Sequence, residues 1–316
     1  MMDALKVLAP GPYTTVQDPG RFGYQQVGIP VSGSLDAFSS QIANLLVGNP
    51  PESAVLEITI LGPRLCALID FDMALCGAEM DLSVNDAPAN RWETVRVKAG
   101  ETIAVGQAKT GCRGYLAVGG GIDVPLVMGS RSTYVGASLG GYQGRCLQTG
   151  DILKIHAKPP LPRTRRLPEA WIPGSPSEIT LRVIPGPQDD FFDAALDILF
   201  QSPYMVTPKA DRMGYRLQGP ALEIKEGMPR SIISEPTMPG GIQIPADRQP
   251  IILLVEQTVG GYAKIGTVIT PDLPRVAQAT PGDTLRFQRV TLEDAHRIYK
   301  DHRNRFQEIT EYLSAR

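Results

Sequence analysis

The chain has 316 residues and a mass of 34.2 kDa, enough for two domains or one large domain. Hydrophobic residues make up 42% and charged residues 20%, so the chain can bury a core. A formal charge of −2 gives no electrostatic reason to expect nucleic acid or an anionic membrane as partner. The 32 glycines and 28 prolines, with only 6% aromatic residues, favour short strands and turns and exclude a helical bundle.

Neither the first residues of the sequence nor its apolar runs suggest export or membrane insertion. The first residues, MMDALKVLAPGPYTT, lack a basic segment followed by an apolar one, and no apolar run approaches about 18 residues. The four cysteines are scattered without a CxxC motif, and the three histidines form neither HxH nor HExxH. We therefore expect a soluble cytoplasmic protein with reduced thiols and no metal.

Three segments show helical periodicity, and most of the remaining chain alternates like strands. The predicted helices cover residues 36–46, 189–200 and 291–313. The first begins at an Asp and ends before Gly-Asn-Pro, while the last begins with a TxxD variant of the capping box. Strands are predicted at 55–60, 94–98, 115–118, 152–155, 179–184, 251–255, 267–269 and 284–287.

A proline-rich segment divides the chain. Residues 157–177 read AKPPLPRTRRLPEAWIPGSPS, with six prolines and a basic cluster. Proline extends the backbone and removes hydrogen-bond donors, so we expect a linker rather than a strand or helix. The predicted organisation is a β domain at 1–157, a linker at 158–177, a second β domain at 178–290 and a C-terminal helix at 291–316.

The two halves contain similar turns. RFGY at 21–24 corresponds to RMGY at 212–215, each with an Asp shortly upstream. RCLQTGD at 145–151 likewise corresponds to RVAQATPGD at 275–283. Duplication of a β-barrel-like unit would explain both pairs, and so would the recurrence of common turn chemistry in a glycine-rich chain.

Several motifs match a known chemistry only formally. GASLG at 136–140 fits the GxSxG pattern, but the GYQG that follows cannot open the helix which a nucleophile elbow requires. The chain has no GxxxxGK[ST] phosphate loop and no Met-Lys-Met context for a biotinylated lysine. We expect no covalent biotin on this chain.

Four glycine-rich loops gather charged and amide side chains. They are QDPGR at 17–21, GSRST at 129–133, DRMGY at 211–215 and EQTVGGY at 256–262. Arginine offers a fork of donors to a carboxylate or phosphate, and glycine lets backbone N–H groups approach a ligand. A carboxylate can act as a general base. The alternative for each loop is a structural ion pair that fixes the turn.

The ordered motifs of the chain resemble one protein family over residues 8–290. It is the family of KipA and allophanate hydrolase subunit 2, also called the biotin-dependent carboxyltransferase family and associated with the C-type subunit of 5-oxoprolinase. The motifs are GPYTTVQDPGRFGYQQVGIPVSGSLDAFSSQIANLLVGNP, EITILGP, GSRST, GGYQGRCLQTGD, ADRMGYRLQGP, SEPTMPGGIQIP and GGYAKIGTVITPDLPRVAQATPGD. The chain departs from the family pattern at EQTVGGY, where a DRQTTGGY-like run is expected, and at Ala246-Asp247-Arg248, which replaces a PDG-like turn.

The resemblance implies a mainly β fold with two cyclophilin-like β-barrel domains, a few helices and a C-terminal helix. It also implies the C-type subunit of an ATP-dependent 5-oxoprolinase, which acts with KipI-like and LamB/YcsF-like subunits and uses ATP in the assembled complex. Two alternatives stay open. One is the carboxyltransferase subunit of a urea carboxylase-like enzyme, and the other is a non-catalytic regulator that binds a KipI-like protein.

Under this resemblance the four loops supply the candidate site. Arg21 or Arg212 would bind the substrate carboxylate or phosphoryl oxygens, and the Gly260 and Gly261 amides would stabilise oxyanion charge. The candidate catalytic carboxylates, which would bind the ring N–H or position water, are Asp18, Asp211 and Glu256. The further candidate substrate-binding residues are Tyr24, Arg131, Tyr215, Gln243, Thr258 and Tyr262.

Overall fold

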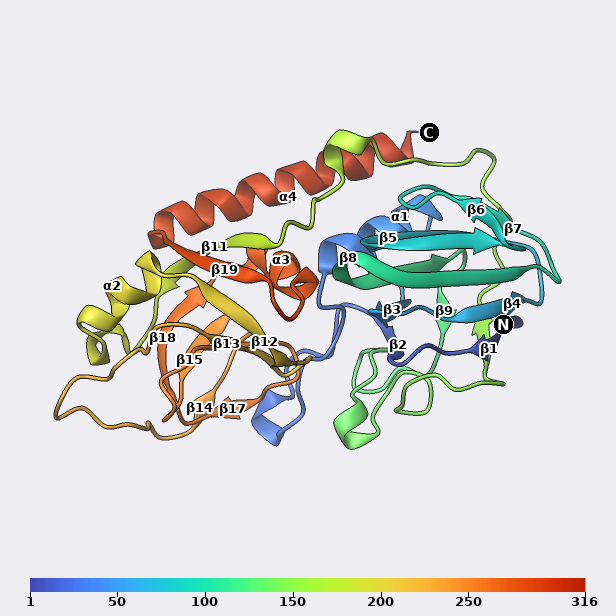
Figure 1. Ribbon diagram of the computed structural model, residues 1–316. Coiled ribbons are helices and arrows are strands. Elements are labelled where there is room, and N and C mark those ends of the chain that lie inside the picture. Colours follow the sequence, from blue (N-terminus) through green and yellow to red (C-terminus); the bar gives the residue numbers. More distant parts are fainter. Residues whose placement is uncertain (316) are drawn as a thin grey trace. The chain divides into compact units, whose positions relative to one another are not determined.

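The computed structural model describes residues 1–315 and divides into two compact units. The first unit comprises residues 1–21, 32–175 and the chain from 306, and the second comprises 22–31 and 176–305. Each unit is built mainly from strands, as Figure 1 shows, and the chain ends in a long helix, α4 (Leu292–Ser314). The predicted mainly β fold with barrel-like sheets and a C-terminal helix is confirmed.

A ten-stranded antiparallel sheet forms the first unit. Its main path is β2-β3-β8-β4-β1-β10-β9, and β5 branches from it by pairing with β6, β7 and β8. The long strands β5 and β8 pair from Met73 opposite Val118 to Val84 opposite Ile103, with register shifts between Gly77 and Leu82. The strands are β1 (Met2–Ala9), β2 (Thr14–Gln17), β3 (Val55–Thr59), β4 (Arg64–Ala67), β5 (Phe71–Val84), β6 (Ala87–Ala89), β7 (Val95–Val97), β8 (Thr102–Val118), β9 (Ile122–Asp123) and β10 (Ile152–Ile155).

The predicted first helix is confirmed as α1 (Ala37–Leu46), which packs on β5 and β8 (Figure 1). Asp36 is its N-cap, because the carboxylate oxygen Oδ1 accepts the backbone N–H of Ser39 at 2.9 Å. Ile42 and Leu46 are fully buried and join the apolar cluster that contains Tyr115 of β8. Capping and the apolar stripe together explain why this segment is helical in a chain of strands.

The predicted linker packs on the first unit instead of running free. Lys158 Nζ donates to the carbonyl oxygen of Val47 at 3.1 Å, and Arg165 Nη1 donates to that of Leu45 at 2.6 Å. Both cations therefore satisfy carbonyl groups at the C-terminal end of α1, where the helix dipole favours positive charge. Leu167 is fully buried. Residues up to 175 thus belong to the first unit, because their basic and apolar side chains find partners there.

A closed barrel of seven strands forms the second unit, in the order β11-β18-β15-β16-β13-β12-β19. Only the β11–β19 pair is parallel. A separate two-stranded ribbon pairs β14 (Glu235–Pro236) with β17 (Val259–Gly260). The barrel strands are β11 (Glu178–Pro185), β12 (Tyr204–Ala210), β13 (Gly214–Gln218), β15 (Gly241–Ile244), β16 (Ile251–Leu253), β18 (Ala263–Val268) and β19 (Thr284–Arg289).

The helical predictions in the second half need one correction. The segment 189–200 is not one helix, because it splits into the 3-10 turn η4 (Asp189–Phe191) and α2 (Ala194–Gln201). Phe192 stands between them in an extended conformation and is 2% exposed, so burial of its ring interrupts the helix. A short helix, α3 (Leu273–Gln278), was not predicted. The remaining 3-10 turns are η1 (Gln25–Val27), η2 (Val135–Ala137), η3 (Glu169–Trp171) and η5 (Thr270–Asp272).

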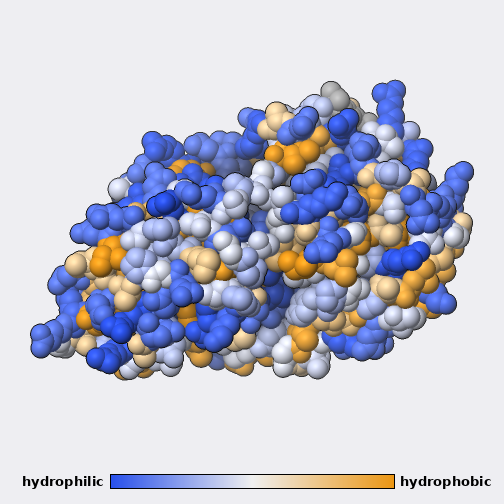
Figure 2. Space-filling view, viewed as in Figure 1, coloured by the Kyte–Doolittle hydropathy of each residue, from blue (hydrophilic) through white to orange (hydrophobic). Residues whose placement is uncertain are grey.

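Helix α4 follows its predicted capping box. Thr291 Oγ1 accepts the backbone N–H of Asp294 at 3.1 Å. The last turns group with the first unit, where Ile309 and Leu313 are buried. No helix among residues 1–315 is long and apolar enough to cross a membrane. The face drawn in Figure 2 is mostly hydrophilic, with small hydrophobic patches.

One of the two predicted repeats is structural. Val7 N–H donates to the Asp151 carbonyl at 2.8 Å and Val206 N–H donates to the Asp283 carbonyl at 2.9 Å. The glycine before each Asp donates back to the same valine, at 2.8 Å and 2.9 Å. The other repeat is a similarity of sequence without a shared structure, because Tyr215 lies in the strand β13 while Tyr24 precedes the 3-10 turn η1.

Two glycines of the first unit offer a matched test of close backbone approach. Gly120 and Gly150 have φ values of 91° and 92°, which L residues rarely adopt. A Cβ at Gly120 would lie 2.0 Å from the carbonyl oxygen of His156, whereas a Cβ at Gly150 meets nothing within 4 Å. We expect Gly150→Ala to cost about 1–2 kcal/mol from backbone strain alone, and Gly120→Ala to cost clearly more. Urea denaturation measures both, and equal losses would contradict the close contact.

Candidate functional site

Asp18 joins two of the predicted loops in the first unit. Its carboxylate accepts the hydroxyls of Ser130 and Ser132 at 2.6 Å and 2.5 Å, and the backbone N–H of Arg131 at 2.6 Å. It also accepts the N–H of Gly20 at 2.8 Å. Four donors therefore bind a carboxylate that is 9% exposed. The structure brings QDPGR and GSRST together through Asp18, and its role as a catalytic carboxylate stays a prediction.

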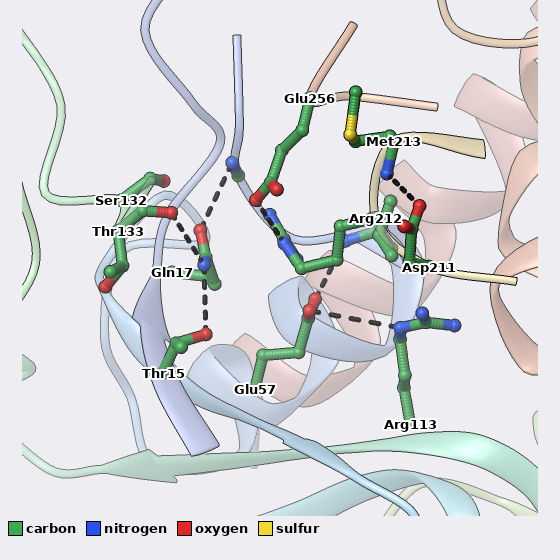
Figure 3. A network of polar contacts seen from close by, with 12 residues as sticks. Thr15, Gln17, Glu57, Arg113, Ser132, Thr133, Asp211, Arg212, Met213 and Glu256 are labelled. Atoms are coloured by element: carbon green, nitrogen blue, oxygen red, sulfur yellow. Dashed lines mark hydrogen bonds and ion pairs between the residues drawn. The ribbon is translucent and has the colours of Figure 1, made fainter. Parts of the chain in front are cut away.

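Arg21 and Gln17 strengthen the same junction. Arg21 is 1% exposed, and its Nη2 donates to the carbonyl oxygen of Ser132. Gln17 Nε2 donates to the Thr133 carbonyl at 3.1 Å and to Thr15 Oγ1 at 3.0 Å (Figure 3). The predicted anion-binding Arg21 is thus buried against the backbone of its own unit, while Arg131 contributes its N–H to Asp18.

A buried ion pair in the first unit was not predicted. Glu57 of β3 and Arg113 of β8 are 1% and 2% exposed, with Oε1 and Nε 4.0 Å apart (Figure 3). Tyr115 Oη donates to Glu57 Oε2 at 2.8 Å, and the N–H of Leu35 donates to the same oxygen at 2.9 Å. Burial, followed by the nearby Glu57 charge, raises the pKa of Tyr115 well above its usual value. Alternating strand patterns gave no hint that these charges face inward.

In the second unit, Arg212 and Glu256 connect the other two predicted loops. Arg212 Nε and Glu256 Oε1 lie 2.5 Å apart, with side chains 4% and 8% exposed (Figure 3). The backbone N–H of Glu256 also donates to the Arg212 carbonyl at 3.1 Å. The sequence therefore named both members of a buried ion pair, without indicating that they bind each other.

The neighbours of Arg212 have separate positions. Asp211 Oδ1 accepts the N–H groups of Met213 at 2.8 Å and Gly214 at 3.1 Å, which fixes the turn between β12 and β13 (Figure 3). Tyr215 is 1% exposed, and its hydroxyl donates to the Ala279 carbonyl at 3.2 Å, so it packs in the barrel core. Tyr24 is half-buried, and its carbonyl accepts the N–H of Val27 at 3.1 Å.

A pocket of about 380 Å³ lies in the second unit, within the usual size range of small-molecule sites. It includes the predicted residues Asp211, Gln243 and Tyr262 but neither Arg212 nor Glu256. Its lining residues are Pro208, Lys209, Ala210, Asp211, Met213, Gly214, Arg216, Gln243, Ile251, Leu253, Gln257 and Tyr262.

Gln243 is the buried polar group of this pocket. It is 3% exposed, and its Nε2 has no hydrogen-bond partner within residues 1–315. Gly260 of the β14–β17 ribbon lies directly against this nitrogen, so that a side chain at Gly260 would collide with it. The ribbon ends are held by backbone bonds from Thr237 to the Thr258 carbonyl at 3.0 Å and from Ile232 to the Gly261 carbonyl at 2.8 Å.

A buried lysine beside the ribbon was missed in the sequence. Lys264 is 6% exposed, and its Nζ forms an ion pair with Glu235 Oε1. Gln188 joins them, since its Nε2 donates to Glu235 at 3.4 Å and its Oε1 accepts the Lys264 N–H at 3.0 Å. The hydrogen bond from Lys264 is the main cause that lowers the pKa of Glu235. The GGYAKIG motif contained the signal, because a lysine between buried strand residues needs a partner.

Comparison with known proteins places this chain in a family. The model of the carboxyltransferase domain, subdomain A and B, matches residues 27–289. The chain belongs to this family. The predicted family resemblance is thereby confirmed.

The relatives differ in length. The chain is 37% identical to the C-type subunit of 5-oxoprolinase from Escherichia coli (strain K12), over 96% of this chain and 97% of that protein. It is 34% identical to the urea amidolyase of Lachancea kluyveri, over 93% of this chain but 17% of that protein. The crystal structure of the K. lactis urea amidolyase matches 97% of this chain and 20% of that one, with a TM-score of 0.92 and 32% identity. The chain thus spans a fifth or less of the urea amidolyases it matches.

The buried pair of Arg212 and Glu256 predicts a specific pattern of stability. Arg212→Ala leaves the Glu256 carboxylate buried without its arginine, which costs about 3–5 kcal/mol in comparable pairs. Replacing both partners, as in Arg212→Met with Glu256→Leu, should cost less because the Glu256 charge is removed together with its arginine. Denaturant unfolding compares the variants. A double variant less stable than Arg212→Ala would contradict this account.

The Lys264–Glu235 pair predicts a pH dependence. Because the folded pKa of Glu235 is lowered, the pair stabilises the fold above the ordinary Glu pKa, and this contribution is lost as the pH falls through the lowered value. Lys264→Met should return the Glu235 pKa towards its ordinary value, and Gln188→Ala should raise it less. NMR titration of the Glu235 carboxyl carbon measures this. An unchanged midpoint in Lys264→Met would show that lysine does not set the pKa.

Proposed function

We propose that this chain is the C-type subunit of an ATP-dependent 5-oxoprolinase. The observation that carries the proposal is the end-to-end correspondence with a separate 5-oxoprolinase subunit, at 96% of this chain and 97% of the relative. The Haemophilus influenzae subunit also corresponds almost end to end, over 94% of this chain and 94% of that protein. The urea amidolyases, by contrast, carry the equivalent region as a small part of a long polypeptide.

The reaction explains why such an enzyme would need ATP. Amide resonance and the five-membered ring favour the closed lactam. Transfer of the γ-phosphoryl group from ATP to the lactam oxygen releases ADP and leaves an imidate-like carbon. Water adds to that carbon, the C–N bond breaks as the nitrogen takes up a proton, and a second water releases phosphate from the acyl phosphate to give glutamate.

The pocket of the second unit supports a binding role for this chain. In this proposal Gln243 and the amides of Gly260 and Gly261 stabilise the developing charge on the lactam oxygen. Asp211 accepts the ring N–H with the carboxylate oxygen that does not cap the turn. KipI-like and LamB/YcsF-like subunits complete the enzyme, ATP is used by the assembled complex, and this chain carries no biotin or metal of its own.

The family description favours a second candidate. A carboxyltransferase subunit would bind carboxybiotin and a urea-like amide with the same glycine-rich loops, and the urea amidolyase structure is similar to this chain over nearly its whole length. This candidate requires a biotinylated carrier. A non-catalytic regulator that binds a KipI-like protein is the third reading, and it requires neither carrier nor substrate.

Reconstitution tests the proposal. The purified chain alone should hydrolyse 5-oxoproline at a negligible rate with ATP, and adding the KipI-like and LamB/YcsF-like subunits should produce glutamate with matching ADP release. The control replaces the two subunits with a biotin carboxylase and a biotinylated carrier, with urea as substrate. Urea-dependent carboxyl transfer without 5-oxoproline turnover would favour the second candidate, and full activity from the lone chain would contradict the multi-subunit proposal.

A further inference from the structure

One row of side chains crosses four strands on the outside of the barrel. In the strand registers Arg216 lies opposite Ile251, Ile251 opposite Gln243, and Gln243 opposite Lys264. Their neighbours along the strands, such as Tyr215, fill the barrel core, so this row faces outward. Since adjacent strands are about 4.8 Å apart, the Cα atoms of Arg216 and Gln243 are separated by about 10 Å.

The positive charges along this row differ in availability. Lys264 is buried and neutralised by Glu235. Arg216 is exposed, lines the pocket, and has no side-chain partner among residues 1–315, and the same holds for the neighbouring Lys209. Arg212, the predicted anion ligand, is instead paired with Glu256 and lies outside the pocket lining. Arg216 is therefore the guanidinium of this pocket that can receive a carboxylate.

Gln243 marks the other end of the pocket. A buried donor without a hydrogen bond costs free energy. An acceptor such as a carbonyl oxygen that binds the Nε2 of Gln243 would remove this cost. Ile251 lies between Arg216 and Gln243 in the register, and Leu253 lines the same pocket. Along the row, the cation Arg216 is therefore followed by the apolar side chain of Ile251 and then by the amide donor of Gln243.

We propose that this pocket binds a small cyclic amide that carries a carboxylate, with Arg216 and Gln243 as its specificity-determining residues. Arg216 binds the carboxylate, the ring lies on Ile251, and Gln243 Nε2 donates to the amide carbonyl oxygen. The choice of 5-oxoproline as the particular ligand rests on the proposed function, whereas the ligand class rests on the pocket. Arg216 thereby takes the carboxylate-binding role that the sequence suggested for Arg212.

Three probe compounds distinguish the contributions of the carboxylate and the amide to binding. Binding to the full chain is measured by NMR titration with 5-oxoproline, with 2-pyrrolidinone, which lacks the carboxylate, and with cyclopentanecarboxylate, which lacks the amide. We expect 5-oxoproline to bind about tenfold or more tightly than either single-ended probe. The probe without a carboxylate loses a hydrogen bond to a charged group, and the probe without an amide leaves the buried Gln243 donor unsatisfied. Equal affinity for all three would overturn the proposal.

Variants assign each end to a residue. Arg216→Gln should weaken 5-oxoproline about tenfold or more and leave 2-pyrrolidinone unchanged, and Arg216→Lys should restore part of the loss. Gln243→Leu should weaken 2-pyrrolidinone as well. The control variant is Arg286→Gln. Arg286 is an exposed arginine on β19 outside the pocket lining, so its substitution should leave the affinities for 5-oxoproline and 2-pyrrolidinone unchanged. Equal effects of Arg286→Gln and Arg216→Gln would overturn the assignment, and thermal unfolding confirms that each variant is folded.

The reconstituted complex separates this proposal from the proposed function. A complex that turns over 5-oxoproline with an unchanged KM in Arg216→Gln would overturn the pocket assignment and leave the function standing. The opposite result is a complex that does not turn over 5-oxoproline although this chain still binds it in an Arg216-dependent manner. That result would support the assignment of the pocket and contradict the proposed 5-oxoprolinase function.

Discussion

The second unit depends on keeping one buried lysine charged. Lys264 projects from a barrel strand into a site with little water, where an unpaired ammonium group is costly. Glu235 meets that need from the ribbon, and its Cα partner in the ribbon is Gly260. The ion pair therefore holds the ribbon on the barrel and places Gly260 beside Gln243. The position of Gly260 beside the pocket therefore depends on the need to neutralise Lys264, which lies on the strand next to Gln243.

Charged contacts also hold the glycine-rich loops in place. Such loops contain few apolar side chains and cannot be anchored by burial alone. In the first unit Asp18 collects donors from two loops, and in the second unit Arg212 and Glu256 join two others. Residues that look catalytic by composition are thus also the ones that hold the loops in place. A loss of activity in their variants must be compared with a loss of stability before a chemical role is assigned.

Local signals in the sequence were reliable where a single residue decides the structure. Asp36 caps α1, Thr291 caps α4, and the ordered motifs identified the family. Predictions failed where the outcome depends on strand register or distant partners. Alternation alone could not show that Tyr215 faces the core while Arg216 faces the pocket, nor that Lys264 would be buried. Three members of the pocket were nevertheless predicted, because loops and the GGIQIP motif carried them.

The proline-rich segment also changes where the two halves can be separated by recombination. Composition places the boundary near residue 157, but Lys158 and Arg165 satisfy the last carbonyl groups of α1. A chimera joined at 157 would take these cations from a foreign parent and expose helix carbonyls that the native chain covers. A junction at about residue 176 keeps the helix and its cations from one parent. The useful exchange point in a chimera of two homologous proteins therefore lies at the end of the basic segment, and not where the prolines begin.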